Sequence, residues 1–124
     1  MINITIPDFV TLPVNELDQV KKILGVYVIL DKHNQPLYVG KGDLFVRLTQ
    51  HLKTSKTTLF RGYIQSVKYF EVWDDTERDI YETYLINTLK PPFNSSKVYS
   101  YDSYFAKKNY VKSIKITESF GSKS

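Results

Sequence analysis

The stretch from Gly25 to Gly40 most constrains the fold of this chain, because it has the pattern of a β-hairpin. Two apolar runs, rich in β-branched residues, flank the polar segment 31–36. Polar, turn-forming residues between two such runs are typical of paired antiparallel strands. Each arm also carries one tyrosine, Tyr27 in the first and Tyr38 in the second. We therefore expect the domain to be organised around a tyrosine-bearing hairpin.

Two registers are compatible with this hairpin. A tight turn pairs Tyr27 with Tyr38, whereas a looser loop over residues 31–36 pairs Tyr27 with Gly40. Both tyrosines share one face of the ribbon in either register, because strand side chains alternate with a period of two. Two phenols on one face can pack in the core or line a site, and tyrosine is favoured in strands in any case.

Size and charge narrow the class of protein. The 124 residues are 42% hydrophobic and 15% aromatic, which suits a single domain over residues 1–124 with a real core. A formal net charge of +4 and a pI of about 9.2 fit a polyanionic partner, although many basic proteins bind none.

The absence of cysteine excludes disulfides and cysteine-ligated zinc, so a reducing compartment is the default. No apolar run approaches the ~20 residues that a membrane helix needs. Residues 1–6 have neither the basic region nor the long apolar core of a signal peptide. We therefore expect a cytoplasmic protein that does not enter the membrane.

Hydrophobic periodicity and breaker residues place the other elements along the chain. Helices are expected over residues 14–24, 44–53, 57–65 and 77–89, with Asp43 as the N-cap of the second and Gly25 ending the first. Strands are expected over residues 2–6, 67–73 and 111–117, and residues 119–124 should fray. The expected buried face of the helix over 77–89 consists of Ile80, Tyr84, Leu85 and Leu89.

Five polar residues are candidates for chemistry, and each has an ordinary alternative role. Arg47 and His51 are four apart on one helix face, where such pairs usually meet solvent. Glu82 lies inside an apolar helix, and carboxylates are rarely buried without a partner, but Glu82 can equally be exposed. Asn94 follows prolines and can form a turn, and Lys41 between two glycines can be a solvated loop residue.

The joint order of these residues resembles the GIY-YIG nuclease family. The first motif is Gly25-Val26-Tyr27, and the second, after ten residues, is Tyr38-Val39-Gly40, with valine in place of isoleucine in both. The resemblance covers a nuclease-like core over residues 24–95 and leaves residues 96–124 as a C-terminal extension. It implies an α+β fold in which helices flank a small central antiparallel sheet of about three strands.

The resemblance implies a metal-dependent endonuclease that hydrolyses DNA phosphodiester bonds with one divalent cation, Mg²⁺ or Mn²⁺. Glu82 resembles the metal ligand, and Mg²⁺ often uses a single protein carboxylate with several waters. The planar fork of Arg47 matches a phosphate. Tyr27 resembles the residue that orients or deprotonates the attacking water. Tyr38 and Asn94 are expected as supports: a phenol that binds phosphate, and an amide that fixes a helix end near the metal.

The general base stays open between two residues. A free phenol has a pKa near ~10, so Tyr27 needs nearby positive charge, from Lys41 or the metal, to act as a base. His51, with an ordinary pKa near ~6.5, can accept the proton instead, directly or through Tyr27. We expect these polar groups to gather around one phosphate, and Lys41 to contact the substrate.

Two alternatives to a DNA endonuclease remain: a non-catalytic nucleic-acid-binding module with the nuclease fold, and a nuclease acting on RNA or on branched DNA. Target recognition is expected from the extension, from a homodimer or from a recruiting protein partner. The basic, tyrosine-rich region over residues 97–115 is the candidate for added DNA contact, through Lys97, Lys107 and Lys108. It can equally be an ordinary packed extension.

Overall fold

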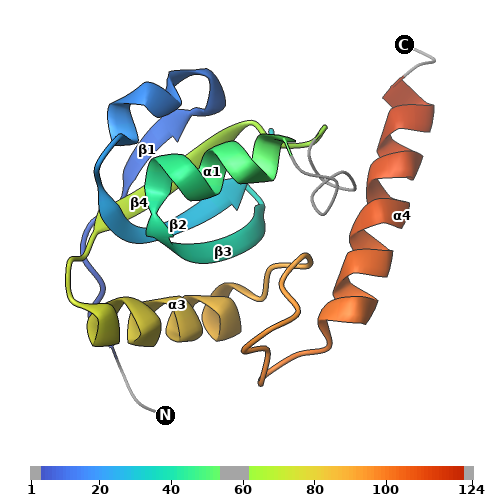
Figure 1. Ribbon diagram of the computed structural model, residues 1–124. Coiled ribbons are helices and arrows are strands. Elements are labelled where there is room, and N and C mark those ends of the chain that lie inside the picture. The colour runs from blue at the N-terminus through green and yellow to red at the C-terminus, as the bar shows by residue number, and fades with distance from the viewer. Residues whose placement is uncertain (1–3, 54–61, 122–124) are drawn as a thin grey trace.

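The structure is a computed structural model that describes residues 4–53 and 62–121, with side chains as far as residue 114. Within these residues, four antiparallel strands form one sheet in the order β1-β4-β2-β3 (Figure 1). The strands are β1 Val10–Pro13, β2 Leu24–Leu30, β3 Pro36–Asp43 and β4 Ser66–Glu71. The helices are the 3-10 helix η1 Val14–Val20, α1 Leu44–Lys53, α3 Asp75–Leu89 and α4 Ser103–Gly121. The expected α+β fold is confirmed, with four strands in place of about three.

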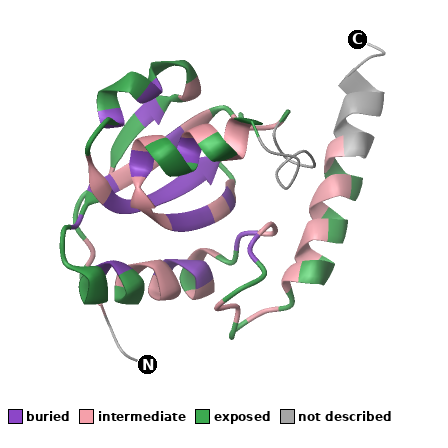
Figure 2. Ribbon diagram, in the orientation of Figure 1, coloured by how far each residue is buried: buried purple, intermediate pink, exposed green. Residues whose placement is uncertain are grey.

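Helices cover both faces of the sheet, and β2 supplies side chains to both cores. Tyr27 and Ile29 join the residues that η1 and α1 bury on one face. Val26 and Val28 point the other way, toward the residues that α3 buries. This division follows from the alternation of side chains along a strand. Figure 2 shows the buried positions concentrated in the central strands and on the helix sides that face them.

The predicted hairpin is confirmed, and it has the looser of the two registers. Tyr27 pairs with Gly40, and Tyr38 lies opposite Ile29. A carboxylate oxygen of the buried Asp31 accepts hydrogen bonds from the backbone N–H groups of His33, at 2.8 Å, and Gln35, at 2.9 Å. These bonds stabilise the conformation of the connecting loop.

Gly25 lies inside a strand, so its expected role of ending a helix is wrong. The helix expected over 14–24 is the shorter η1, with non-helical dihedrals at Glu16, and Leu24 already belongs to β2. Gly25 pairs with Gly42 on one side and Glu71 on the other. Helical spacing was present in this segment, but strand pairing on two sides determines the conformation from Leu24 onward.

The first and last predicted strands are also wrong. Residues 4–6 are not in a strand, residues 2–3 lie outside the described residues, and the edge strand is β1, paired with β4. Residues 111–117 belong to α4, which begins after Asp102; the Asp102 side chain accepts the Phe105 backbone N–H at 3.1 Å. This N-cap was the overlooked helix signal. Of the helix expected over 57–65, residues 57–61 lie outside the described residues and 62–65 are not helical.

The predictions for α1, β4 and α3 are confirmed, with one change in the buried face. Asp43 accepts the Val46 N–H at the start of α1, and Asp74 accepts the Glu77 N–H at the start of α3. In α3, however, Ile80 is 49% exposed, whereas Arg78 is buried and donates to a backbone carbonyl oxygen. None of the helices in the described part of the chain is both long and apolar enough to cross a membrane.

We predict that Gly25→Ala lowers the free energy of unfolding by about 1–3 kcal/mol, because an added Cβ would overlap the backbone carbonyl oxygen of Phe70 in β4. Urea denaturation at neutral pH measures the change. Gly62→Ala is the matched control, since no atom lies within 4 Å of its added Cβ. Equal stability of the two variants would show that β2 and β4 are not this close.

Candidate active site

A hydrogen bond between Tyr27 and His51 lies at the centre of the site. Tyr27 is 2% exposed on β2, and its phenol ring crosses the adjacent strand at Gly40. An added Cβ at Gly40 would overlap the phenol oxygen, so only glycine leaves room for this ring. The phenol oxygen lies 2.8 Å from His51 Nε2 on α1. The second glycine-containing motif therefore creates the space in which the tyrosine of the first motif reaches the helix.

Tyr38 completes a cluster of three rings. Its centroid lies 6.3 Å from that of Tyr27 and 4.6 Å from that of His51. These separations are typical of favourable contacts between aromatic rings. The expectation that both tyrosines share a face of the hairpin is confirmed, and that face meets the end of α1.

Arg47 brings an exposed positive charge to the rings. It lies on α1 one turn before His51, and its side chain passes over Gly42, whose positive φ of 122° and missing side chain leave space for it. The guanidinium charge is close enough to lower the pKa values of Tyr27 and His51. An exposed guanidinium beside a buried ring cluster is well placed to meet a phosphate.

Glu82 lies on α3, which packs against the other face of the sheet and along β3. Its side chain is 12% exposed. Burial raises the pKa of Tyr38, and the negative charge of Glu82 raises it further; the same charge also acts on Tyr27. The Glu82 carboxylate is therefore close enough to both phenols for its charge to affect their acidity.

Positive charge within the protein does not bring the pKa of Tyr27 below its ordinary value. Burial raises it far above the ordinary value, with Tyr38 adding to the rise, and Arg47 opposes this only in part. Burial, helped by Arg47, lowers the pKa of His51 to about 4. Both groups are therefore neutral at pH 7. In the tautomer with its proton on Nδ1, His51 accepts a hydrogen bond from the Tyr27 hydroxyl at Nε2.

Asn94 is 5% exposed and acts as a clamp on the edge strand β3. Its side-chain oxygen accepts the backbone N–H of Val39, and its side-chain nitrogen donates to the carbonyl oxygen of the same residue, both at 2.9 Å. The amide was expected to fix a helix end. The structure instead shows it holding the strand that carries Tyr38.

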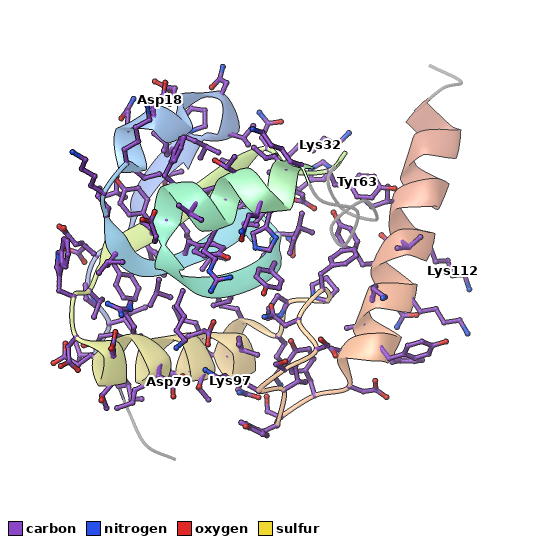
Figure 3. The ribbon with its side chains drawn as sticks, in the orientation of Figure 1. Asp18, Lys32, Tyr63, Asp79, Lys97 and Lys112 are labelled. Carbon is purple, nitrogen blue, oxygen red and sulfur yellow. The ribbon has the colours of Figure 1, made fainter. Side chains whose placement is uncertain are left out.

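Of the four lysines expected to bind the substrate, Lys97 and Lys41 both contact Asp79, and the other two lie on α4. Lys97 Nζ lies 2.7 Å from Glu82 Oε1 and also contacts Asp79 (Figure 3). Burial lowers the pKa of Lys97, but hydrogen bonds to the two carboxylates outweigh it and raise the pKa overall. Lys41 Nζ lies 3.4 Å from Asp79 Oδ1. The remaining candidates, Lys107 and Lys108, lie on α4, which contacts the hairpin loop through a 2.7 Å hydrogen bond from Tyr110 to Asp31.

Two residues of this region were missed from the sequence. Asp79 precedes Glu82 by three positions on α3, a spacing that places both on one helix face and could have been read from the sequence. Asn87 lies one further turn along α3, and its side chain binds the backbone of the loop over residues 97–100. Its amide nitrogen also donates to the Thr83 carbonyl oxygen on the same helix, but no local pattern reveals the loop contacts of Asn87, because those partners lie 10 to 13 residues away.

The donor set fits a hard divalent cation held by few protein ligands. No group of three or more histidine, cysteine, aspartate or glutamate side chains with metal-binding geometry occurs among the described residues. Glu82 already accepts a cationic group, the Lys97 ammonium, and Asp79 lies beside it. Oxygen donors in small number suit Mg²⁺, which keeps most of its waters in proteins. Glu82 and Asp79 are the carboxylates of this region that could hold such a cation.

Fold and site together define a nuclease domain of the GIY-YIG type, and comparison with known proteins makes the family specific. Residues 24–95 match the family described as the UvrC-like GIY-YIG domain, and the chain belongs to this family. In the structural comparison, the endonuclease domain of UvrC from Thermotoga maritima bound to magnesium matches with a TM-score of 0.57 at 26% identity. That match covers 65% of this chain and 93% of the UvrC domain.

Two similar curated proteins differ in how much of their own length the match covers. An uncharacterized protein of Bacillus subtilis, YurQ, is 32% identical over 78 residues, covering 60% of this chain and 63% of YurQ. The UvrABC system protein C of Desulfotalea psychrophila is 37% identical over 76 residues, covering 56% of this chain but only 12% of that protein. The similarity is therefore to the nuclease domain of the longer proteins.

We predict that protonation of His51 destabilises the fold at acid pH. Its pKa is lowered from 6.5 to about 4 on folding, so the unfolded chain binds more protons between these values. The associated stability is fully present above pH 6.5 and is lost as the pH falls toward 4. Urea midpoints at pH 7.0, 5.5 and 4.5 measure this loss, and His51→Gln should reduce it. An unchanged pH dependence in that variant would show that His51 titrates normally.

Proposed function

We propose that this chain is a metal-dependent endonuclease that hydrolyses phosphodiester bonds in DNA. The observation that carries the proposal is the Tyr27–His51 hydrogen bond, with the charges of Arg47 and Glu82 both acting on the Tyr27 phenol. Membership of a nuclease domain family supports it, as does the similarity to an endonuclease domain bound to a catalytic divalent cation.

Proton removal from the attacking water is assigned to Tyr27 and His51 as a pair. The buried phenol is too weak an acid to be ionised at pH 7, so it acts by relay. Tyr27 accepts the proton of the water as its own proton passes to His51 Nε2, 2.8 Å away. An incoming phosphate brings negative charge, which raises the pKa of His51 and makes it a better acceptor.

Arg47 and Tyr38 bind the phosphate in this proposal. The reaction adds the water oxygen to phosphorus and breaks the bond between phosphorus and the 3′-oxygen, which takes up a proton from solvent. The products are a 5′-phosphate and a 3′-hydroxyl. Negative charge grows on the phosphate oxygens during the step, and the exposed guanidinium of Arg47 neutralises part of it. The Tyr38 phenol donates a hydrogen bond to the same phosphate. Asn94 is a positioning residue, because it holds the strand that carries Tyr38.

Glu82 would hold the divalent cation, Mg²⁺ or Mn²⁺. When bound, such a cation supplies neutralising charge to the phosphate and to the leaving oxygen. Lys41 borders this region on β3, through its contact with Asp79, and is assigned to the phosphate backbone of the substrate.

The extension is proposed to add affinity for the nucleic acid. α4 carries Lys107 and Lys108, and neighbouring aromatic residues are exposed: 73% of Tyr104 and 60% of Phe105 face solvent. Lysines pair with phosphates, and exposed aromatic rings can stack on unpaired bases. Further recognition is assigned to a second copy of the chain or to a recruiting protein.

We predict that Glu82→Gln lowers the rate of Mg²⁺-dependent plasmid nicking about a hundredfold or more, because it removes the carboxylate that holds the cation. Glu77→Gln is the matched control: it makes the same chemical change at an exposed position of the same helix and should cut normally. Circular dichroism checks that both variants fold. Wild-type nicking by Glu82→Gln would refute the metal role of Glu82.

We also predict that Arg47→Ala abolishes nicking while leaving the fold intact, because the side chain is exposed and its loss removes the proposed phosphate contact. Cleavage of single-stranded DNA, duplex DNA, branched DNA and RNA by the unaltered protein, with and without Mg²⁺, identifies the substrate. Retardation of DNA in a gel without any cleavage would favour a binding module instead of a nuclease.

A further inference from the structure

The metal-binding carboxylate proposed above already has a cationic partner within the chain. Lys97 Nζ lies 2.7 Å from Glu82 Oε1 and also contacts Asp79. Lys41, on β3, contacts Asp79 as well. The network therefore joins two carboxylates to two ammonium groups. The side chains of Lys97 and Glu82 are 28% and 12% exposed, whereas that of Asp79 is 51% exposed. Lys97 thus bridges a partly buried carboxylate and a solvent-facing one.

The position of Lys97 is set by its backbone as well as by its charge. Its φ is 61°, in the left-handed region that residues other than glycine rarely adopt. The Asn87 side chain donates to the Lys97 carbonyl oxygen at 2.8 Å and accepts the N–H groups of Tyr99, at 2.7 Å, and Ser100, at 2.9 Å. Asn87 belongs to the same helix as Glu82 and Asp79. The loop is therefore attached to α3 independently of the lysine side chain.

An ammonium group and a divalent cation cannot both occupy this place without cost. They bear charge of the same sign, and their repulsion is strong in a partly buried site. A hard cation at Glu82 would also bind the carboxylate that now accepts the Lys97 ammonium. Asp79, three residues earlier on the same helix face, offers the ammonium a second partner that it already contacts.

We propose that Lys97 is an internal cation that competes with the divalent metal for Glu82 and sets the metal affinity of the site. Metal binding displaces the ammonium from Glu82 and leaves it paired with Asp79. Without the metal, the same lysine neutralises the negative charge of this partly buried carboxylate. This inference rests on the proposed metal role of Glu82.

The test measures Mn²⁺ binding to the full chain without DNA, by electron paramagnetic resonance or calorimetry. Lys97→Met should bind Mn²⁺ about tenfold more tightly than the unaltered protein, a change of about 1.4 kcal/mol. Lys97→Arg keeps the positive charge and should bind like the unaltered protein. Lys41→Met is the matched control: it removes the same charge from the same network, but Lys41 pairs with Asp79, so the affinity should change by less than about threefold.

Two results would overturn the proposal: no gain of affinity in Lys97→Met, or an equal gain in Lys41→Met, which would indicate a general charge effect. Glu82→Gln separates the inference from its premise. If Glu82→Gln binds Mn²⁺ as well as the unaltered protein, the proposed metal site fails, and the competition fails with it. If only Glu82→Gln loses binding and Lys97→Met is unchanged, the metal site stands and the competition fails.

A measurement on the unaltered protein avoids any folding defect in the variants. Nuclear magnetic resonance of the lysine side-chain ammonium groups should show a shift of the Lys97 signal on addition of Mg²⁺, larger than that of Lys41. An unchanged Lys97 signal at saturating Mg²⁺ would show that the ammonium stays on Glu82 and would refute the displacement.

Discussion

The site depends on a missing side chain. Gly40 lies opposite Tyr27 in the paired strands, and an added Cβ there would overlap the phenol oxygen. Without that Cβ, the ring crosses the strand and reaches His51 on the helix above. Burial then keeps both groups neutral at pH 7. The acid–base properties of the pair thus follow from strand register and packing before any substrate is present.

The candidate site is assembled at the edge of the sheet because only there can groups from both layers meet. Arg47 and His51 come from α1 on one face, and Glu82 comes from α3 on the other. β3 is the edge strand between them, and Asn94 holds its position through two hydrogen bonds to one residue. At a central strand, the sheet itself would separate the side chains of α1 from those of α3.

Four elements could be predicted from the sequence, because each has a strong local period, turn or cap: the hairpin, α1, β4 and α3. The register of the hairpin could not be predicted, since Tyr27 and Tyr38 share a face in both alternatives. The two registers differ in whether the Tyr27 ring lies over Gly40, which has space for it. The direction of the Tyr27 pKa shift depends on burial, which no sequence pattern gives. Lys97 was assigned to DNA as part of the basic region over residues 97–115. Its ion pairs could not be read from the sequence, because the two carboxylates lie 15 and 18 residues earlier in the chain.

The clamp on β3 also has a consequence for self-association. Outer strands with unpaired backbone groups are templates on which a second chain can extend a sheet. In β3, the outward N–H and carbonyl of Val39 are taken by Asn94, and the carbonyl of Leu37 accepts the N–H of Phe93. The opposite border, β1, is only four residues long and ends in proline. A second chain that paired with this part of β3 would have to displace Asn94 and Phe93 first.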